Sequence, residues 1–432
     1  MNIIDKSEAD SVGSAVLLCF PARKEMDPTM AELLVIADDL TGALDSGVKL
    51  ACKGQSVLVS LDLEDGLHNA ACADVIVIDS ESRHDTADVA YRKVFELVST
   101  SCSAGIPRVY KKTDSGLRGN VGAELVAVLD ASGASHLNFV PAYPKQNRTT
   151  KDGIHYVDGV PLAQSIFSTD PLNPVTKSSV SDLIHEQSDI AVTRHGEQPS
   201  PAGIVVYDCV SDDELQSIAE TITDTDFDAP MAGCAGLLEM LPGTDSHFEH
   251  GEAPTLSPQL IVISGSVNKV TSAQLDAAEA SGAFRRHLPI ERILDGAWDD
   301  DEAKRFVDQA LADGAESPII LIDTLGCHID ASRFADGAAA KAISDAASQC
   351  AALVSTASDR TVMIVGGDAL AGFIEKAGAS VLEPVCELFP GIVVARYTGP
   401  HTSGTIVTKS GAFGGVNLFY DIYGTLKEKV GE

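Results

Sequence analysis

The chain has 432 residues, of which 44% are hydrophobic, and 63 acidic residues against 31 basic ones give it a formal net charge of −32. A field of that sign repels nucleic acid and anionic membrane surfaces, so we exclude both as partners. The length suits two large α/β domains or about three domains of ~150 residues.

Cysteine usage and the N-terminus indicate where the protein works. The nine cysteines are scattered and form no Cys-x-x-Cys pair, which is typical of a reducing compartment. No apolar run approaches the ~18 residues of a membrane span, and acidic residues precede the mildly apolar stretch 12–22. We therefore expect a cytoplasmic protein, with residues 1–30 a disordered extension.

From residue 33 onward, short apolar runs alternate with amphipathic ones. Strands are predicted at 33–37, 57–61, 75–79, 109–112 and 137–140, and helices between the first two strands up to residue 53, at 85–102 and at 121–129. This alternation favours parallel βαβ units in a doubly wound sheet. Segment 141–176 breaks the rhythm, and it contains a predicted hairpin, 154–157 with 160–161, around Asp158 and Gly159.

A polar, turn-rich stretch at 243–258 predicts a domain boundary. Before it lie a strand at 204–207 and helices from 212 and at 236–241. After it come strands at 260–263, 319–322, 362–365, 392–395 and 406–408, with helices from 271, at 331–354, from 369 and at 417–426. The sequence thus predicts an α/β fold of two domains, 31–245 and 257–432. Each would be a mostly parallel sheet flanked by helices, with an interdomain active-site cleft.

Two adjacent carboxylates, Asp38 and Asp39, follow the first predicted strand. In open α/β sheets ligands bind at this edge, and neighbouring carboxylates usually have a cation, a hydroxyl or a proton between them. The alternative is that Asp39 or Thr41 only caps the following helix.

A basic loop follows the strand at 109–112. Residues 111–120 combine two lysines, Arg118 and two glycines inside a strongly acidic chain, which predicts an anion-binding loop. A solvated turn is the alternative. Arg83, after the strand at 75–79, offers a planar fork suited to a carboxylate, although an arginine in that place is more often a surface residue.

Three glycine-containing turns lie in the second predicted domain, at 264–271, 366–369 and 409–415. Each follows a predicted strand, and the first two lead into helix N-termini, which favour phosphate. None fits the Walker pattern or the dinucleotide fingerprint, which disfavours a dehydrogenase. Any one of them is an ordinary turn, but three in one domain favour a nucleotide.

These motifs also carry a resemblance. The order ADDLTGALDSG, DSESR, KKTDSGLRGN, VPAYPKQNRTTKDGIHYVDGVPL with DPLNPVT, SGSVNKVT, GGDA and KSGAFGG resembles the four-carbon acid sugar kinase family over about residues 33–420. The resemblance implies an ATP-dependent kinase that phosphorylates the C4 hydroxyl of threonate, erythronate or a 3-oxo-tetronate. The partners would be the sugar acid and ATP. Mg²⁺ would ride on the ATP phosphates with mostly water and phosphate ligands, within reach of Asp368.

Carried over by motif, the resemblance implies roles for particular residues. Asp39, with Asp38, would orient and deprotonate the C4 hydroxyl, and Asp114 is a second candidate base. The residues expected to contact the sugar acid are Asp38, Arg83, Lys112, Thr113, Asp114 and Ser115. Those expected to contact ATP are Ser264, Ser266, Gly366, Gly367, Asp368, Ala369 and Gly411.

Three positions depart from the family motifs: Gly116 and Ala369 stand where threonine is usual, and Ala412 where asparagine is usual. The sequence leaves the stereoisomer and the oligomeric state open, and a homodimer is compatible with it. A rival hypothesis is a non-catalytic sensor that binds a small acid and a nucleotide. It would leave the three glycine turns of the second domain without a function.

Overall fold

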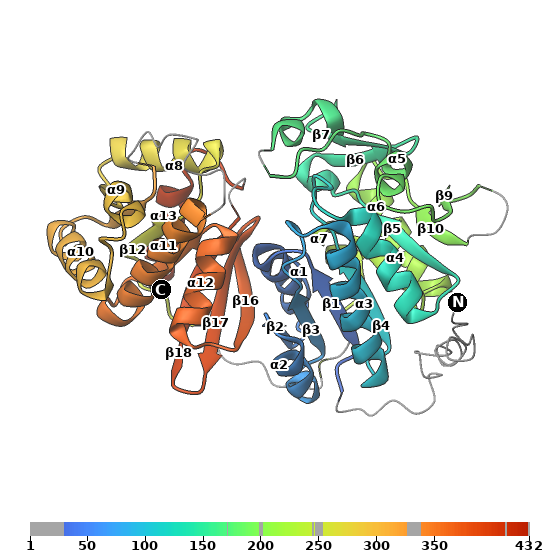
Figure 1. Cartoon of the computed structure of the whole chain (residues 1–432), viewed down its shortest axis with the longest axis horizontal. Coiled ribbons are helices and arrows are strands. Elements are labelled where there is room, and N and C mark those ends of the chain that lie inside the picture. The colour runs from blue at the N-terminus through green and yellow to red at the C-terminus, as the bar shows by residue number, and fades with distance from the viewer. Residues whose placement is uncertain are drawn as a thin grey trace, which may run out of the picture. The chain divides into compact units, whose positions relative to one another are not determined.

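The computed structural model describes residues 30–170, 172–197, 202–243, 246, 254–325, 338–410 and 413–430, so the expected N-terminal extension lies almost wholly outside the described residues. The chain forms two compact units. Unit 1 contains the chain up to Leu34 and Ser82–Leu237, and unit 2 contains Val35–Glu81 and Leu238 onward. Both are built from β-strands flanked by helices, which confirms the predicted α/β class (Figure 1).

Unit 1 contains a parallel sheet of short strands. Their order in space is β4 (Arg108–Lys112), β11 (Met231–Gly233), β5 (His136–Val140), β10 (Gly203–Val206) and β9 (Val192–Arg194). The helices are α3 (Ala87–Ser103), α4 (Val121–Ser132), α5 (Val180–His185), α6 (Asp212–Thr225) and α7 (Ala235–Met240). Because parallel strands align their carboxyl ends at one edge, the loops after β4 and β5 open on the same side.

The irregular segment after β5 forms a small antiparallel sheet of its own. It consists of β6 (Arg148–Lys151), β7 (Ile154–Val157) and β8 (Val160–Pro161), with 3₁₀ turns at Pro144–Gln146, Leu162–Gln164 and Ile166–Thr169. The predicted hairpin is β7–β8, and both central residues of its turn, Asp158 and Gly159, have positive φ (51° and 81°), as such tight hairpins require. Figure 1 shows these strands in green at one end of the sheet of unit 1.

The described residues of unit 2 form ten strands, of which β1 begins two residues before the unit. Their order is β13 (Phe284–His287), β14 (Ile319–Asp323), β12 (Leu260–Ser264), β15 (Thr361–Val365), β18 (Thr402–Lys409), β17 (Ile392–Gly399), β16 (Val381–Phe389), β2 (Val57–Ser60), β3 (Val75–Asp79) and β1 (Leu33–Ala37). The run from β13 to β18 is parallel, whereas β17 and β16 are antiparallel to their neighbours. Strand β16 is not among the predicted strands, because Pro384 and two glutamates interrupt its apolar pattern.

The helices of unit 2 pack against these strands. They are α1 (Leu40–Ala51), α2 (Leu63–His68) with the 3₁₀ turn Ala70–Cys72, α8 (Lys269–Ala280), α9 (Ile290–Leu294), α10 (Asp300–Asp313), α11 (Ala338–Ala357), α12 (Gly367–Ala377) and α13 (Leu418–Val430). One core joins α8 and α13 to β12, β14, β15, β17 and β18 through side chains such as Leu275, Val365 and Phe419. Among the helices described, none has the length and apolarity to cross a bilayer.

Candidate active site

Three carboxyl groups gather where β1 and β3 end. The two strands end side by side, because the amide and hydroxyl of Ser80 donate to the Ala37 carbonyl at 2.9 and 2.7 Å. Asp38 and Asp79 are buried. Burial, then the charges of Asp39, Glu81 and Asp38, raise the pKa of Asp79 well above its usual value, despite a hydrogen bond from the Glu81 amide. These surroundings therefore favour the protonated form of Asp79.

Asp39 is the N-cap of α1. Its carboxylate accepts from the Gly42 amide at 2.8 Å and from the Thr41 hydroxyl at 3.0 Å. The capping alternative is thus part of the structure. A carboxylate has about four acceptor positions, so capping leaves room for a further partner.

The first turns of α1 and α12 are neighbours within unit 2. A Cβ added at Gly367 would lie 3.9 Å from the Thr41 methyl carbon. The helix N-terminus that carries Asp39 therefore lies beside the glycine turn that opens α12.

In unit 1, the loop after β4 is built around a buried ion-pair cluster. The guanidinium of Arg118 holds Asp114 with two hydrogen bonds, at 2.9 and 2.8 Å, and Arg83 lies 3.8 Å from the same carboxylate. Burial alone would raise the pKa of Asp114, but the charges of Arg118, Arg83 and Lys112 hold it well below its usual value. Asp114 is therefore a stable anion that orders two arginines.

The two lysines at the end of β4 differ in their surroundings. The ammonium of Lys111 is fully buried, 3.0 Å from Glu124, and it donates to the Lys112 carbonyl at 2.7 Å. Lys112 forms no ion pair with any residue that the structure describes. Lys111 therefore supports the fold of the loop, whereas Lys112 is not held in an ion pair within the described residues.

The loop after β4 also contains a buried hydroxyl and a main-chain contact with the small sheet. The hydroxyl of Thr113 is buried and has no hydrogen-bond partner among the described residues, which in native proteins usually points to a missing water or ligand.

The neighbouring Ser115 carbonyl accepts from Nε2 of His155, 3.2 Å away on β7. Nδ1 of the same ring lies 3.0 Å from the Thr150 hydroxyl. The small sheet thus supports the loop through a neutral histidine.

In unit 2, the C-terminal ends of five neighbouring strands line up in register. His287, Asp323, Ser264, Val365 and Lys409 are successive cross-strand neighbours, which places the turns after β12, β15 and β18 side by side. These turns are the three glycine loops: residues 264–268, residues 366–369, and Ser410 with 413–415. Predicted Gly411 lies outside the described residues.

The first two glycine loops are in contact. Gly366 has a φ of 110°, and a Cβ there would lie 3.6 Å from the Ser266 amide. A Cβ on Gly265 would lie 3.0 Å from the methyl group of Ala369. Such close backbone approach leaves amide groups, rather than side chains, to face a ligand.

The predicted ATP-binding residues differ in exposure. Ser264 and Ala369 are buried, Ser266, Gly366 and Gly367 are partly exposed, and Asp368, in the first turn of α12, is exposed. In the parts of the chain that the structure describes, no three His, Cys, Asp or Glu side chains gather as a metal-ligand group.

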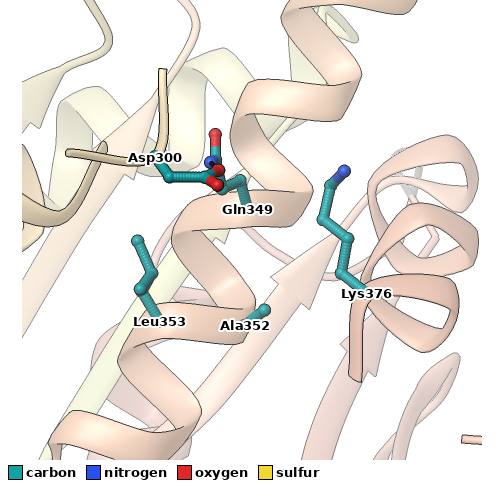
Figure 2. A pocket seen from close by; sticks show the side chains of 5 residues that line it. All are labelled: Asp300, Gln349, Ala352, Leu353 and Lys376. Atoms are coloured by element: carbon teal, nitrogen blue, oxygen red, sulfur yellow. Dashed lines mark hydrogen bonds between the residues drawn. The ribbon is translucent and has the colours of Figure 1, made fainter. Parts of the chain in front are cut away.

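A shallow pocket of about 300 Å³ lies elsewhere in unit 2 (Figure 2). Asp300, Gln349, Ala352, Leu353 and Lys376 line it, on or beside α10, α11 and α12. Lys376 belongs to the last turn of α12, whereas the glycine loop opens the first turn. This pocket therefore does not belong to the strand-end row.

Two family models match the chain. A sugar-binding N-terminal domain matches residues 33–241, and a nucleotide-binding C-terminal domain matches residues 261–419. The chain belongs to the four-carbon acid sugar kinase family. It is therefore a phosphotransferase, which confirms the resemblance read from the motifs.

Relatives of this kinase are identical to it at about a quarter to a third of the aligned positions. A D-threonate kinase of Salmonella typhimurium is 34% identical over 58% of this chain and 62% of its own length. One of Bordetella bronchiseptica is 29% identical over 88% and 94%. Other relatives are named D-erythronate kinase and 3-oxo-tetronate kinase. A solved structure from Salmonella typhimurium LT2 matches with a TM-score of 0.73 at 22% identity, covering 90% of this chain and 98% of that one, which shows the common fold.

Two departures from the kinase motifs have a structural reason. Phe167 fills the space beside Gly116, where an added Cβ would lie 2.6 Å from the ring. The guanidinium groups of Arg118 and Arg148 lie 5.0 and 5.7 Å from the same ring. Ala369 packs against Gly265 as described above, and Ala412 lies outside the described residues.

Several polar residues near these sites were not predicted from the sequence. They are Asp79, His155, Gln274, Asp323 and Lys409. Asp79 and Lys409 each end a strand, and this position in the sequence could have marked them as candidate site residues. The burial of His155 and Gln274, and the pairing of Asp323 with Arg285 (2.7 Å) and His287 (3.0 Å), depend on contacts distant in sequence.

Proposed function

We propose that this kinase transfers the terminal phosphate of ATP to the C4 hydroxyl of a four-carbon sugar acid: threonate, erythronate or a 3-oxo-tetronate. The observation that carries the proposal is the contact within unit 2 between the first turns of α1 and α12. It sets the carboxylates of Asp38 and Asp39 beside a glycine loop of the type that receives nucleotide phosphates.

In this proposal the sugar acid is recognised by the loop after β4. Arg83 and Lys112 neutralise its carboxylate or hold its hydroxyls, with further contacts from Thr113, Asp114 and Ser115. Two observations support these roles: the unpaired buried hydroxyl of Thr113, and the charge of Lys112 in a chain of net charge −32. An acidic protein needs such a local basic cluster to bind an anion.

Asp39 is the proposed base for the C4 hydroxyl, with Asp38 beside it. Phosphoryl transfer needs positioning, charge neutralisation and one group to accept or orient the hydroxyl proton. Asp114 is the weaker candidate, because its lowered pKa makes it a poor proton acceptor. The raised pKa of Asp79 favours its neutral form, which would reduce the repulsion around Asp38 and Asp39.

ATP would bind at the three glycine loops through Ser264, Ser266, Gly366, Gly367, Asp368, Ala369 and Gly411. Mg²⁺ would be held mainly by phosphates and water, as this ion prefers. The exposed carboxylate of Asp368, in the first turn of α12, is the protein group proposed to face it. Functional domains at 31–245 and 257–432, a cytoplasmic location and a homodimer stay predictions.

The test is ADP release in a coupled assay with Mg-ATP and purified protein. The substrates are D- and L-threonate, D- and L-erythronate and the 3-oxo-tetronates. We expect strong turnover with one acid, and NMR of the product should place the phosphate on C4. ATP binding without turnover on any of these acids would contradict the proposal and favour the sensor hypothesis.

A further inference from the structure

Lys409 is a fully buried lysine at the end of β18, in the row of strand ends. Its main chain pairs with Val365, the last residue of β15, and with Ile392 of β17. The side chain therefore begins beneath the glycine loops. Lysines are seldom fully buried, because burying an ammonium group is costly.

Lys409 is hydrogen-bonded to the structure around all three loops. Its ammonium lies 3.2 Å from the hydroxyl of Thr271, in the first turn of the helix that follows loop 264–268. The same ammonium donates to the Ser410 carbonyl at 3.1 Å, in the third loop. Its main-chain carbonyl accepts from the Gly366 amide at 3.2 Å, in the second.

Gln274 ties the same elements together one turn further along α8. Its amide nitrogen lies 2.9, 3.0 and 3.0 Å from the carbonyls of Phe413, Gly414 and Gly415. Its carbonyl oxygen is buried and has no hydrogen-bond partner among the described residues. Helix α8 is thus attached to the third loop through Gln274 and to Lys409 through Thr271.

The charge state of Lys409 responds to its surroundings. Burial lowers its pKa to about 7, so near neutral pH the side chain is charged in only part of the molecules. Among the charged groups on the packed elements are Lys269 on α8 and Asp368 on α12, both exposed, and Arg396 on β17, which pairs with Glu383 at 2.7 Å. An anion arriving at the loops would favour the charged form of Lys409.

We propose that Lys409 is a positioning residue for ATP: it joins the three glycine loops and supplies a positive charge beneath the phosphates. The inference rests on the proposed nucleotide site and deepens it. Nucleotide binding would then be coupled to uptake of a proton by this side chain. Because the pKa is low in the free protein and rises in the complex, the affinity is fullest below pH 7 and falls as the pH rises above it.

The coupling is measured by titrating the whole protein with Mg-ATP by calorimetry at pH 7.5 and pH 9, in two buffers of different ionisation enthalpy. The nucleotide phosphates do not titrate in this range, because their last pKa is about 6. For the wild-type protein we expect the affinity to fall about tenfold or more between the two pH values, with net proton uptake. Lys409→Met should bind more weakly at pH 7.5 and lose most of this pH dependence.

Lys409→Arg keeps the charge and should lose the pH dependence while binding more tightly than Lys409→Met. Lys376→Met, at an exposed position at the other end of α12, is the matched control and should behave as the wild type. Two outcomes would overturn the inference about Lys409 and leave the proposed function standing. One is a wild-type affinity for Mg-ATP that does not change with pH, and the other is a Lys409→Met variant with unchanged affinity and pH dependence. Failure of the wild-type protein to bind Mg-ATP would overturn the proposed function itself.

Discussion

Gly116, in the loop after β4, and Phe167 form a complementary pair. The ring occupies the volume that a threonine would need, and two arginines lie over it. The family motif predicts a threonine hydroxyl here. This kinase has instead an aromatic ring that orders Arg118, which in turn holds Asp114. The departure at Gly116 is therefore a change of packing as well as a lost hydrogen-bond group.

We expect Gly116→Thr to lower the free energy of unfolding by about 1–3 kcal/mol and to raise KM for the sugar acid, because the new atoms overlap Phe167. Urea denaturation and steady-state kinetics measure the two effects. In Gly116→Thr/Phe167→Ala the overlap is absent, so the double variant should be more stable than the sum of the single changes predicts. Additive effects would show that the two residues do not compete for space.

His155 is a buried neutral histidine that connects the small sheet to the Ser115 carbonyl. Burial lowers its pKa to about 4, against an ordinary value of about 6.5. A histidine of this kind favours the folded state at high pH. As the pH falls below the unfolded value, the unfolded chain gains a proton that the folded protein does not take up until about pH 4.

Between pH 7 and pH 5 this one group should reduce the free energy of unfolding by about 2 kcal/mol. The measurement is urea denaturation of the wild type and of His155→Gln at both pH values. The variant should lose that part of the pH dependence. His68→Gln, at an exposed histidine on α2, should retain it. Equal pH dependence in His155→Gln and the wild type would contradict the assignment.

At the scale of elements, α1 combines a structural and a chemical function in one residue. Asp39 caps the helix, and the same carboxylate is the proposed base. Asparagine also caps helices well but cannot accept the proton, so it separates the two functions.

Asp39→Asn should lower turnover by at least about 100-fold and change the free energy of unfolding by less than about 0.5 kcal/mol. Asp39→Ala should lose about 1 kcal/mol of stability as well. Asp299→Asn provides the control, because Asp299 caps α10 by accepting from the Glu302 amide at 2.8 Å, and its turnover should be unchanged. Near-normal turnover in Asp39→Asn would remove Asp39 as the base.

Elements with a simple pattern were predicted well. The strands β1, β3 and β7 have the predicted ends, because each is a short apolar or alternating run bounded by polar residues. Strands β13 and β16 were missed, since Arg285 and Arg286 in one and Pro384 in the other hide the pattern. Their pairing with β14 and β17 stabilises them in the fold.

At the scale of the whole molecule, the net charge of −32 is the dominant electrostatic feature. Self-repulsion of this size destabilises the compact state, and salt screens it, since the Debye length falls from about 10 Å at 0.1 M to about 3 Å at 1 M. Buried pairs such as Lys111 with Glu124 are screened much less than exposed charges.

We therefore expect the thermal midpoint to rise by several degrees when NaCl is raised from about 0.1 to 1 M, because repulsion among exposed carboxylates weakens. Differential scanning calorimetry measures it, with an uncharged osmolyte at equal osmolality as the control. A midpoint that stays constant or falls with salt would show that attractive ion pairs outweigh the net repulsion.

The fold class, the order of most elements and the family could be predicted from the sequence, because they depend on local periodicity and on motifs contiguous in the chain. The sequence also indicated the loops that carry the proposed site. Only the tertiary structure separated Lys111 from Lys112, placed Phe167 over Gly116 and aligned Lys409 with Ser264. Burial and hydrogen bonding between residues distant in sequence decide these relations, and neither has a period that a single chain displays.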